Sequence, residues 1–238
     1  LAGRKEQGKL HENGILYDTI VTSDLGRKVA ASYGLKTESF LTGFKYIGGQ
    51  INHYEQQENG PAFEFGYEES YGCLIAPFAR DKDGIQAILL YCEMALYYKK
   101  KGIPLDIAFD RLQQRYGYHG TKTISLFFEG EQGSAEMKKI MGDLRRAPLK
   151  ELDGVKVIRV EDYVSLLARN SDGSEEKLTL PQSEVVRLFF EDGSWAVVRP
   201  SGTEPKCKFY CEVVSVQKEG LDKKVSAFAN SLKEALVK

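Results

Sequence analysis

The chain has 238 residues, 42% hydrophobic and 28% charged, which is ordinary globular composition and excludes a disordered, collagen-like or membrane protein. At roughly 100–200 residues per domain, this length predicts one large domain or two modest ones. The 33 basic and 34 acidic residues give a net charge of −1, which argues against nucleic-acid binding, so any anion must be bound locally.

The first half alternates expected strands and helices. Residues 1–13 are polar and charged and indicate a linker or the tail of a helix. Strands are expected at 14–23, 36–41 and 62–68, and helices at 25–33 after a capping Asp24, at 42–55, at 83–101 and up to Tyr116. The helix at 83–101 carries Ile85, Ile88, Leu89, Cys92 and Leu96 along one face. This alternation predicts an α/β sandwich.

The pattern changes at the turn GYHG, residues 117–120, where we place a domain boundary. Beyond it, strands are expected at 121–129, 155–160, 163–169, 184–191, 194–199 and 206–215, with helices at 134–146 and 221–237. Asp192-Gly193 between two of these strands is a hairpin signal. The second half therefore predicts an α+β domain with an antiparallel sheet and helices on one face.

The cysteines are Cys73, Cys92, Cys207 and Cys211, and no two form a Cys-x-x-Cys pair. Cys207 and Cys211 are four apart in an expected strand, roughly 13 Å, which is too far for a disulfide. We expect free buried thiols in a reducing cytoplasm. The histidines show no metal-ligand spacing, and no apolar run approaches the roughly 20 residues of a membrane span.

The loop Arg199–Lys206, with the sequence RPSGTEPK, is the most informative stretch of the chain. The Arg199 guanidinium is a planar fork of donors that suits a phosphate, and Ser201 and Thr203 add hydroxyls. Gly202 would let an anion approach its N–H closely. A solvated hairpin turn explains the same residues, and physics alone leaves the two interpretations even. The loop lacks the GxxxxGK[ST] pattern, so it does not support nucleotide hydrolysis.

The segment GYEESYG, residues 66–72, follows an expected strand, at the edge where open α/β sheets bind ligands. Glu68 and Ser70 alternate, so in an extended chain they would point the same way. A carboxylate beside a hydroxyl suits neighbouring sugar hydroxyls. A solvated surface turn is the simpler interpretation, and on these residues alone it is preferred.

Two further segments also have simple structural interpretations. In TGFKYIG, residues 42–48, Thr42 can cap the following helix, and the exposed N–H groups there would face an oxygen-rich ligand. Capping alone is sufficient. In RDKDG, residues 80–84, Lys82 lies between two carboxylates, which oppose the proton loss that a base requires. A solvated charge cluster is favoured unless Lys82 lies over a substrate.

In this order, TGFK, GYEESYG, DKDG and RPSGTEPK resemble the C-terminal half of the alpha-D-phosphohexomutases, the phosphoglucomutase and phosphomannomutase family. The resemblance covers nearly the whole chain. It implies the third and fourth of four domains: a sugar-binding sandwich with a mixed sheet over 14–117, and a phosphate-binding α+β domain over 118–238. The family reaction moves a phosphoryl group between the C1 and C6 oxygens of a hexose, through a bisphosphate that turns round in the site.

The resemblance also implies roles for individual residues. The sugar side of the site would contain Thr42, Gly43, Lys45, Glu68 and Ser70, and the phosphate side Arg199, Ser201, Gly202, Thr203 and Lys206. Lys82 matches a proposed proton-transfer lysine of the family. A nearby phosphate dianion would raise its pKa, so an acid role is expected no less than a base role.

Two features of the family are missing from the sequence: a serine followed by His-Asn-Pro, which carries the phosphoryl group, and the DGDxDR magnesium loop. The resemblance thus implies Mg²⁺ and a sugar 1,6-bisphosphate as cofactors of the full-length enzyme, with no metal ligand in this chain. Catalysis of phosphoryl transfer needs the donor and the metal. We expect a cytoplasmic, substrate-binding fragment that is inactive alone, with a phosphosugar and the N-terminal domains as partners.

Several alternatives stay open. Tyr71 in GYEESYG favours the phosphoglucomutase and phosphopentomutase branch, and a sugar 1,6-bisphosphate synthase would share every motif. A stand-alone sugar-phosphate-binding module and an interaction domain with relic loops are the non-enzymatic alternatives. In a fragment, faces that pack against missing domains should be exposed and apolar.

Overall fold

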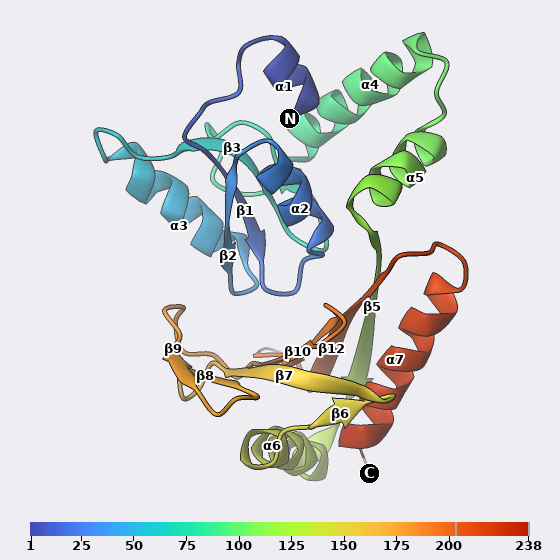
Figure 1. Cartoon of the computed structure of the whole chain (residues 1–238). Coiled ribbons are helices and arrows are strands. Elements are labelled where there is room, and N and C mark those ends of the chain that lie inside the picture. The colour runs from blue at the N-terminus through green and yellow to red at the C-terminus, as the bar shows by residue number, and fades with distance from the viewer. Residues whose placement is uncertain (203, 238) are drawn as a thin grey trace. The chain divides into compact units, whose positions relative to one another are not determined.

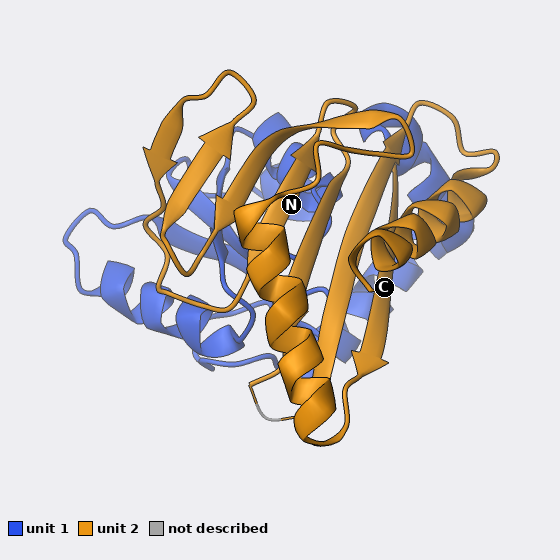
Figure 2. Cartoon of the chain, turned by 90° about the horizontal axis from the view of Figure 1, so that it is seen from below, with its two compact units in different colours: residues 1–117 blue, residues 118–238 orange. Residues whose placement is uncertain are grey.

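The structure is a computed structural model that describes residues 1–202 and 204–237. The chain divides into two compact units, residues 1–117 and 118–238, which Figure 2 shows in different colours. Each unit has its own sheet, so each is described by itself.

The first unit is built on a mixed sheet (Figure 1). Its elements are α1 (Ala2–Glu6), β1 (Gly14–Thr19), α2 (Leu25–Ser32), β2 (Lys36–Phe40), α3 (Phe44–Glu55), β3 (Ala62–Tyr67), β4 (Cys73–Leu74), α4 (Gly84–Lys100) and α5 (Leu105–Tyr116). The strand order is β2-β1-β3-β4, with β1 parallel to both neighbours and β4 antiparallel to β3. The expected α/β sandwich with a mixed sheet is confirmed.

The central strand β1 is buried on both faces, and its residues alternate between two cores. Ile15 and Tyr17 pack with Ile47 of α3, whereas Leu16 packs with Ala30 of α2. Successive side chains of a strand point to opposite faces, so α2 and α3 cover opposite faces of the sheet. Every residue of β1 is buried, as expected for a central parallel strand that is covered on both faces.

The strand expected at 14–23 ends at Thr19, because a turn follows. The Thr22 N–H donates to the Thr19 carbonyl at 2.9 Å, and the two threonine hydroxyls lie 2.8 Å apart. Asp24 does precede α2, but its side chain makes no capping hydrogen bond; it pairs with Arg27 instead. The turn thus ends the strand directly beside the sheet edge that carries the predicted sugar loops.

The helix expected at 83–101 forms as α4, but its apolar face is not covered. Ile85, Ile88, Leu89, Cys92 and Leu96 are all exposed, and none of the residues of α4 is buried. No helix in the described part of the chain is both long enough and apolar enough to cross a membrane. The sequence pattern predicted the helix correctly but not its exposure.

The second unit is an antiparallel sheet with helices on one face. Its elements are β5 (Tyr118–Phe127), α6 (Gly130–Arg146), β6 (Glu151–Leu152), β7 (Val155–Asp162), β8 (Leu167–Asn170), β9 (Glu175–Lys177), β10 (Val186–Phe190), β11 (Trp195–Pro200), β12 (Lys206–Ser215) and α7 (Leu221–Leu236). The strand order is β5-β12-β11-β10-β7-β8-β9, with β6 paired to β7, and every pairing is antiparallel.

Both helices of this unit pack on the same face of its sheet (Figure 2). Leu144 of α6 and Phe228 of α7 belong to one core with Val198 of β11 and Phe209 of β12. The expected antiparallel sheet with helices on one face is confirmed. The expected hairpin at Asp192-Gly193 also forms: it joins β10 to β11, and Gly193 has a φ of 85°.

One expected strand, 163–169, is replaced in part by a turn. β7 continues to Asp162, and the chain turns at Leu166, which has a φ of 56°, before β8 begins at Leu167. The Tyr163 N–H instead donates to the Val185 carbonyl at 3.0 Å. Apolar residues in this turn had the composition of a strand, so composition alone placed the boundary wrongly.

All four cysteines are free, as expected, but only two of them are buried. Cys207 and Cys211 lie in the core of the second unit, where burial raises the pKa of their thiols to about 12 and about 11. Cys73 is half-buried and Cys92 is exposed on α4. The expectation that all four are buried is therefore wrong for these last two.

Candidate functional site

Three segments of the first unit end at the same edge of its sheet. Because β1, β2 and β3 are parallel, the residues after Thr19, Phe40 and Tyr67 all leave the sheet at its carboxyl edge. This is the edge where open α/β sheets bind ligands. The predicted segments 42–45 and 68–70 therefore lie at one site for a topological reason.

Glu68 joins two of the other predicted residues. Its Oε1 accepts the Gly43 N–H at 2.7 Å, and its Oε2 lies 2.6 Å from the Lys82 Nζ. Only 7% of the Glu68 side chain is exposed. Three positions far apart in the sequence thus form one polar cluster, and neither contact could be read from the sequence.

Lys82 is held by anions and by an aromatic ring. Its Nζ also lies 3.3 Å from Asp81 Oδ1 and 4.9 Å from the centroid of the Phe44 ring. Burial lowers the pKa of Lys82, but the hydrogen bonds and charges of Glu68 and Asp81 outweigh it, and the pKa is raised. The side chain is therefore an ammonium at neutral pH, which favours donating a proton over accepting one.

The predicted capping role of Thr42 is wrong. The N-cap of α3 is Gly43, whose φ of 124° favours glycine, and no side chain caps this helix. The Thr42 hydroxyl is buried and has no hydrogen-bond partner among the residues that the structure describes. A buried unpaired hydroxyl costs about 1–3 kcal/mol, so an available ligand oxygen would be a favourable partner.

Ser70 does not extend the strand alongside Glu68. β3 ends at Tyr67, and the Glu68 N–H donates to the Gly72 carbonyl at 3.4 Å, closing a turn whose tip is the exposed Tyr71. The Ser70 hydroxyl donates to Glu69 Oε1 at 3.1 Å. The expectation of an extended chain that aims both side chains the same way is therefore wrong.

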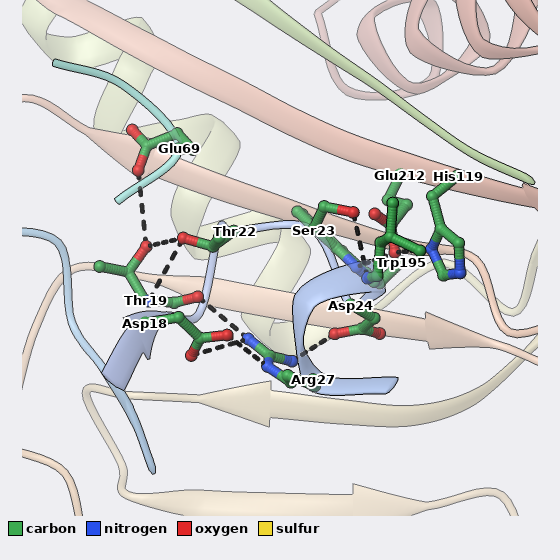
Figure 3. A network of polar contacts seen from close by, with 11 residues as sticks. Asp18, Thr19, Thr22, Ser23, Asp24, Arg27, Glu69, His119, Trp195 and Glu212 are labelled. Atoms are coloured by element: carbon green, nitrogen blue, oxygen red, sulfur yellow. Dashed lines mark hydrogen bonds and ion pairs between the residues drawn. The ribbon is translucent and has the colours of Figure 1, made fainter. Parts of the chain in front are cut away.

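A network missed by the sequence reading supports this turn from beneath (Figure 3). Glu69 Oε2 accepts a long hydrogen bond, 3.5 Å, from the hydroxyl of Thr19. The Arg27 guanidinium donates to both carboxylate oxygens of the fully buried Asp18, at 2.7 and 3.3 Å, and to the Thr19 carbonyl at 3.0 Å. The end of β1 is thus fixed to α2 and to the turn. A charged residue inside an apolar strand, Asp18, was the available signal.

Lys45 is not joined to this cluster. It lies exposed on the first turn of α3, and its Nζ is 5.0 Å from the centroid of the Tyr46 ring. In the described part of the chain, no contact links Lys45 to Glu68, Ser70 or Lys82. Its predicted role in binding stays a prediction.

In the second unit, the predicted phosphate loop follows the paired end of β11. Arg199 lies opposite Lys208 of β12, and the Ser201 N–H donates to the Lys206 carbonyl at 2.8 Å. Among the described residues, the Arg199 guanidinium has no acidic partner, whereas Lys206 pairs with Glu204. Arg199 is therefore the cation of this loop that is available to an anion.

The phosphate-binding roles of Ser201 and Gly202, the next residues of this loop, stay predictions. No atom lies within 4 Å of a Cβ built on Gly202, so its surroundings are open. Thr203 lies outside the described residues. The Ser201 hydroxyl accepts the Glu204 N–H at 3.3 Å, which closes the loop on itself.

The described residues contain no cluster of three or more histidine, cysteine or acidic side chains that could hold a metal ion. Asp81 and Asp83, the two carboxylates that flank Lys82, are engaged elsewhere: Asp81 contacts Lys82, and Asp83 caps α4 through the N–H groups of Ile85 and Gln86. The site as it stands offers hydrogen bonds and positive charge and does not fit a divalent cation.

Comparison with known protein families gives two adjacent matches. Residues 1–116 match the model described as phosphoglucomutase/phosphomannomutase, alpha/beta/alpha domain III. Residues 131–222 match phosphoglucomutase/phosphomannomutase, C-terminal domain. The two matches follow the order of the two units.

Curated relatives are considerably longer than this chain. The phosphoglucomutase of Staphylococcus epidermidis is 38% identical over 199 residues, which cover 83% of this chain and 36% of the relative. That of Staphylococcus aureus is 32% identical over 225 residues, 94% of this chain and 40% of the relative. The chain therefore spans well under half the length of these relatives.

Two solved structures share the fold. The phosphoprotein pp63/parafusin, a phosphoglucomutase from Paramecium in an open form, aligns with a TM-score of 0.64 at 25% identity, covering 94% of this chain and 37% of that one. A putative phosphomannomutase from Thermus thermophilus aligns with a TM-score of 0.60 at 17% identity, over 98% of this chain and 38% of that one. The second likeness bears on the fold alone.

Proposed function

The chain belongs to the phosphoglucomutase/phosphomannomutase family, and from that premise we propose that it is the sugar- and phosphate-binding part of a magnesium-dependent phosphohexomutase. The observation that carries the proposal is the cluster of Gly43, Glu68 and Lys82. Three family motifs, separated by up to 39 positions along the chain, meet at one carboxylate.

In this proposal, Glu68 recognises the sugar ring. Each carboxylate oxygen has two lone-pair sites, so each oxygen can accept a sugar hydroxyl besides its present partner. The Thr42 hydroxyl, which has no partner among the described residues, and the Ser70 hydroxyl add donors and acceptors beside it. A set of groups that accept and donate in several directions suits a sugar that binds in two orientations.

Arg199 would hold the phosphate that is not reacting. A guanidinium can donate two parallel hydrogen bonds to a phosphate, and Arg199 has no acidic competitor among the described residues. The Ser201 and Gly202 groups of the same loop would complete the cradle, with Lys206 supplying a further charge. The proposal therefore divides recognition between the two units, the sugar going to the first and the phosphate to the second.

Lys82 would place a proton and a positive charge near the reacting oxygen. Because its pKa is raised, the proton is present at neutral pH, and the charge would stabilise a transferring phosphoryl group. Magnesium, when bound by the whole protein, would neutralise phosphate charge. The described residues do not form its site, so no step of this chain is assigned to it.

Glucose is the hexose that the proposal favours. The sequence motifs leave a phosphopentomutase or a sugar 1,6-bisphosphate synthase as alternatives, and the curated relatives named above carry the name phosphoglucomutase. Competition between hexose and pentose phosphates in the full-length protein would separate these. A reducing cytoplasm suits four free cysteines and is part of the same proposal.

Calorimetric titration of glucose 1-phosphate into the chain tests the proposal, with inorganic phosphate as the competitor. We expect saturable binding that is tighter than that of phosphate. Glu68→Gln should weaken sugar-phosphate binding about tenfold or more and leave phosphate binding unchanged, because charged hydrogen bonds are worth about 1.5–3 kcal/mol. Arg199→Lys should weaken both.

Glu58→Gln is the matched control, because Glu58 is exposed in the loop before β3, at the opposite end of that strand. It should leave both affinities unchanged. Sugar phosphate that binds no tighter than inorganic phosphate, or a Glu68→Gln variant that binds like the wild type, would contradict the proposal for this chain. A stand-alone interaction domain would show that second result.

A further inference from the structure

Glu69 has no part in the proposed function, yet both of its carboxylate oxygens are engaged. Oε1 accepts the Ser70 hydroxyl at 3.1 Å, and Oε2 accepts the Thr19 hydroxyl at 3.5 Å, a contact that Figure 3 shows. Consecutive side chains of an extended strand point to opposite faces. Here the turn that the Glu68 N–H closes with the Gly72 carbonyl brings two neighbouring side chains together. Glu69 therefore connects the end of β1 to the serine of the candidate sugar loop.

The Thr19 end of this connection is well anchored. Thr19 is fully buried, its N–H donates to the Thr22 hydroxyl at 3.3 Å, and the two hydroxyls lie 2.8 Å apart. The Thr19 carbonyl accepts from the Arg27 guanidinium at 3.0 Å, which also binds the buried Asp18. A hydroxyl has one proton, so when Thr19 donates to Glu69, the Thr22 hydroxyl is the donor between the two threonines. Glu69 is thus held from the sheet, at the end of its central strand.

The hydrogen bond to Glu69 decides what Ser70 can offer to a ligand. A hydroxyl has one proton and two lone pairs, whereas a carboxylate only accepts. The Ser70 proton is used by Glu69, and the lone pairs of its oxygen remain. Donation to a charged acceptor also makes this oxygen a better acceptor, because linked hydrogen bonds polarise one another. Since the Glu68 carboxylate also only accepts, both side chains require a donor from the ligand.

We propose that Glu69 is a positioning residue: it holds Ser70 as a hydrogen-bond acceptor, so that the site selects a sugar phosphate with a free ring hydroxyl facing Ser70. The inference rests on the proposed function, in which Ser70 contacts the sugar ring. A ring hydroxyl has a proton to donate. A sugar with fluorine in place of that hydroxyl leaves the serine oxygen without a donor, and a site built around such a contact rejects the analogue.

A double-mutant cycle, measured by calorimetric titration of glucose 1-phosphate, tests whether Glu69 acts through Ser70. Ser70→Ala should weaken binding about tenfold, and Glu69→Leu about threefold or more. In the Ser70→Ala background, Glu69→Leu should cause no further loss, because the serine that Glu69 positions is gone. Glu69→Gln should stay within about twofold of the wild type, because its amide oxygen accepts the same hydroxyl and its amide N–H can donate to Thr19.

Glu58→Leu is the matched control for the loss of a carboxylate. Glu58 is exposed in the loop before β3, away from this turn, so the change should leave the affinity unaltered. Urea unfolding checks that each variant folds. The stoichiometry of the same titrations gives the fraction of chain that is competent to bind, so a folding defect is not mistaken for a loss of affinity.

Analogues of glucose 1-phosphate with fluorine in place of one ring hydroxyl test the direction of the hydrogen bond. Fluorine cannot donate, so the analogue fluorinated at the position facing Ser70 should bind about tenfold or more weakly to the wild type. Ser70→Ala identifies that position, because the penalty there disappears with the serine oxygen. Glu69→Leu should reduce the same penalty, since the freed hydroxyl can turn its proton toward the fluorine. A purely structural role of Glu69 would leave this ratio of affinities unchanged.

The outcomes separate this inference from the proposed function. A wild-type chain that binds no glucose 1-phosphate would overturn both. Binding that Glu68→Gln weakens, with a Glu69→Leu variant that binds like the wild type or loses as much affinity without Ser70 as with it, would overturn the role of Glu69 alone. A fluorine penalty that is equal in the wild type and in Glu69→Leu would overturn the assignment of Ser70 as an acceptor.

Discussion

At the scale of single residues, the buried carboxylate of Glu68 organises the first unit's candidate site. One oxygen holds the start of α3 through Gly43, and the other holds Lys82, at the start of α4. Removing either partner would leave charge in a poorly solvated place, which costs more than an exposed ion pair would. The chemistry of Lys82 therefore depends on Glu68.

The first prediction concerns the protonation of Lys82. The folded-state pKa is raised above 10.5, so the ion pair stabilises the fold at neutral pH and is lost as the pH rises through that raised value. Glu68→Gln should lower the pKa of Lys82, because it removes the larger of the two raising contributions. Titration of the lysine ¹³Cε signals by NMR measures this; an unchanged Lys82 pKa in the variant would contradict the ion pair.

The second prediction concerns the unpaired hydroxyl of Thr42. Thr42→Val removes a buried polar group that has no partner among the described residues, so the free energy of unfolding should stay equal or rise, by at most about 1–3 kcal/mol. Affinity for glucose 1-phosphate should fall about tenfold. Urea unfolding and calorimetry measure the two effects.

Thr37 supplies the control for that prediction. Its hydroxyl is also buried and without a partner among the described residues, but it lies within β2 instead of at the carboxyl edge of the sheet. Thr37→Val should change stability in the same direction and leave affinity unchanged. Equal losses of affinity in both variants would mean that Thr42 acts through the fold and not on the ligand.

Residue types at the site could be predicted from the sequence, but their contacts could not. The motif order identified Glu68, Lys82 and Arg199 as candidates. The pairing of Glu68 with Lys82 depends on the path of the chain between β3 and α4, and local spacing says nothing about that path. Thr42 was expected to cap a helix because its hydroxyl type does so often, whereas the cap is a glycine.

At the scale of elements, strands beside a clear turn signal and strands with a regular alternation of residues were predicted best. The hairpin at Asp192-Gly193 and the strand 206–215 formed as expected, because the turn chemistry and the alternation of β12 are both local signals. The strands at 14–23 and 163–169 were misjudged at their ends, where apolar turn residues resemble strand residues. Exposure of α4 was not predictable, because burial depends on what packs against a helix.

The third prediction concerns α3. This helix starts after Gly43, whose N–H is bound by Glu68, and it passes close to residue 80. A Cβ on Gly48 would lie 2.4 Å from the Arg80 carbonyl oxygen, in the segment that leads to Lys82, whereas a Cβ on Gly49 meets nothing within 4 Å. Gly48→Ala should therefore destabilise the chain by about 1–3 kcal/mol. Gly49→Ala in the same helix should stabilise it by about 0.5–1 kcal/mol.

Urea unfolding of the two alanine variants measures that difference. Because both substitutions gain the same helix propensity, the difference between them isolates the close approach of α3 to residue 80. Two variants with equal free energies of unfolding would mean that this contact is relaxed in solution. Gly48→Ala should also weaken binding of glucose 1-phosphate, since the displaced segment carries Lys82.

At the scale of the whole molecule, the chain matches domain III and the C-terminal domain of the family, and its sequence lacks the two motifs to which the reaction is attributed. The phosphoserine and magnesium motifs are absent from the sequence, and the chain covers under half of its curated relatives. Catalysis of phosphoryl transfer consists of positioning the transferring group and stabilising its charge. A chain that binds substrate but has no phosphoryl donor therefore has no group to transfer. We therefore expect the isolated chain to bind substrate without converting it.

The last prediction is that the isolated chain interconverts no detectable glucose 1-phosphate and glucose 6-phosphate, even with Mg²⁺ and glucose 1,6-bisphosphate added, whereas a full-length protein containing it does. A coupled assay for glucose 6-phosphate measures both. An Arg199→Ala chain purified in parallel controls for contaminating enzyme, because contamination is equal in both preparations. Activity present in the wild-type chain and lost in Arg199→Ala would contradict the prediction, and it would require a phosphoryl donor within these 238 residues.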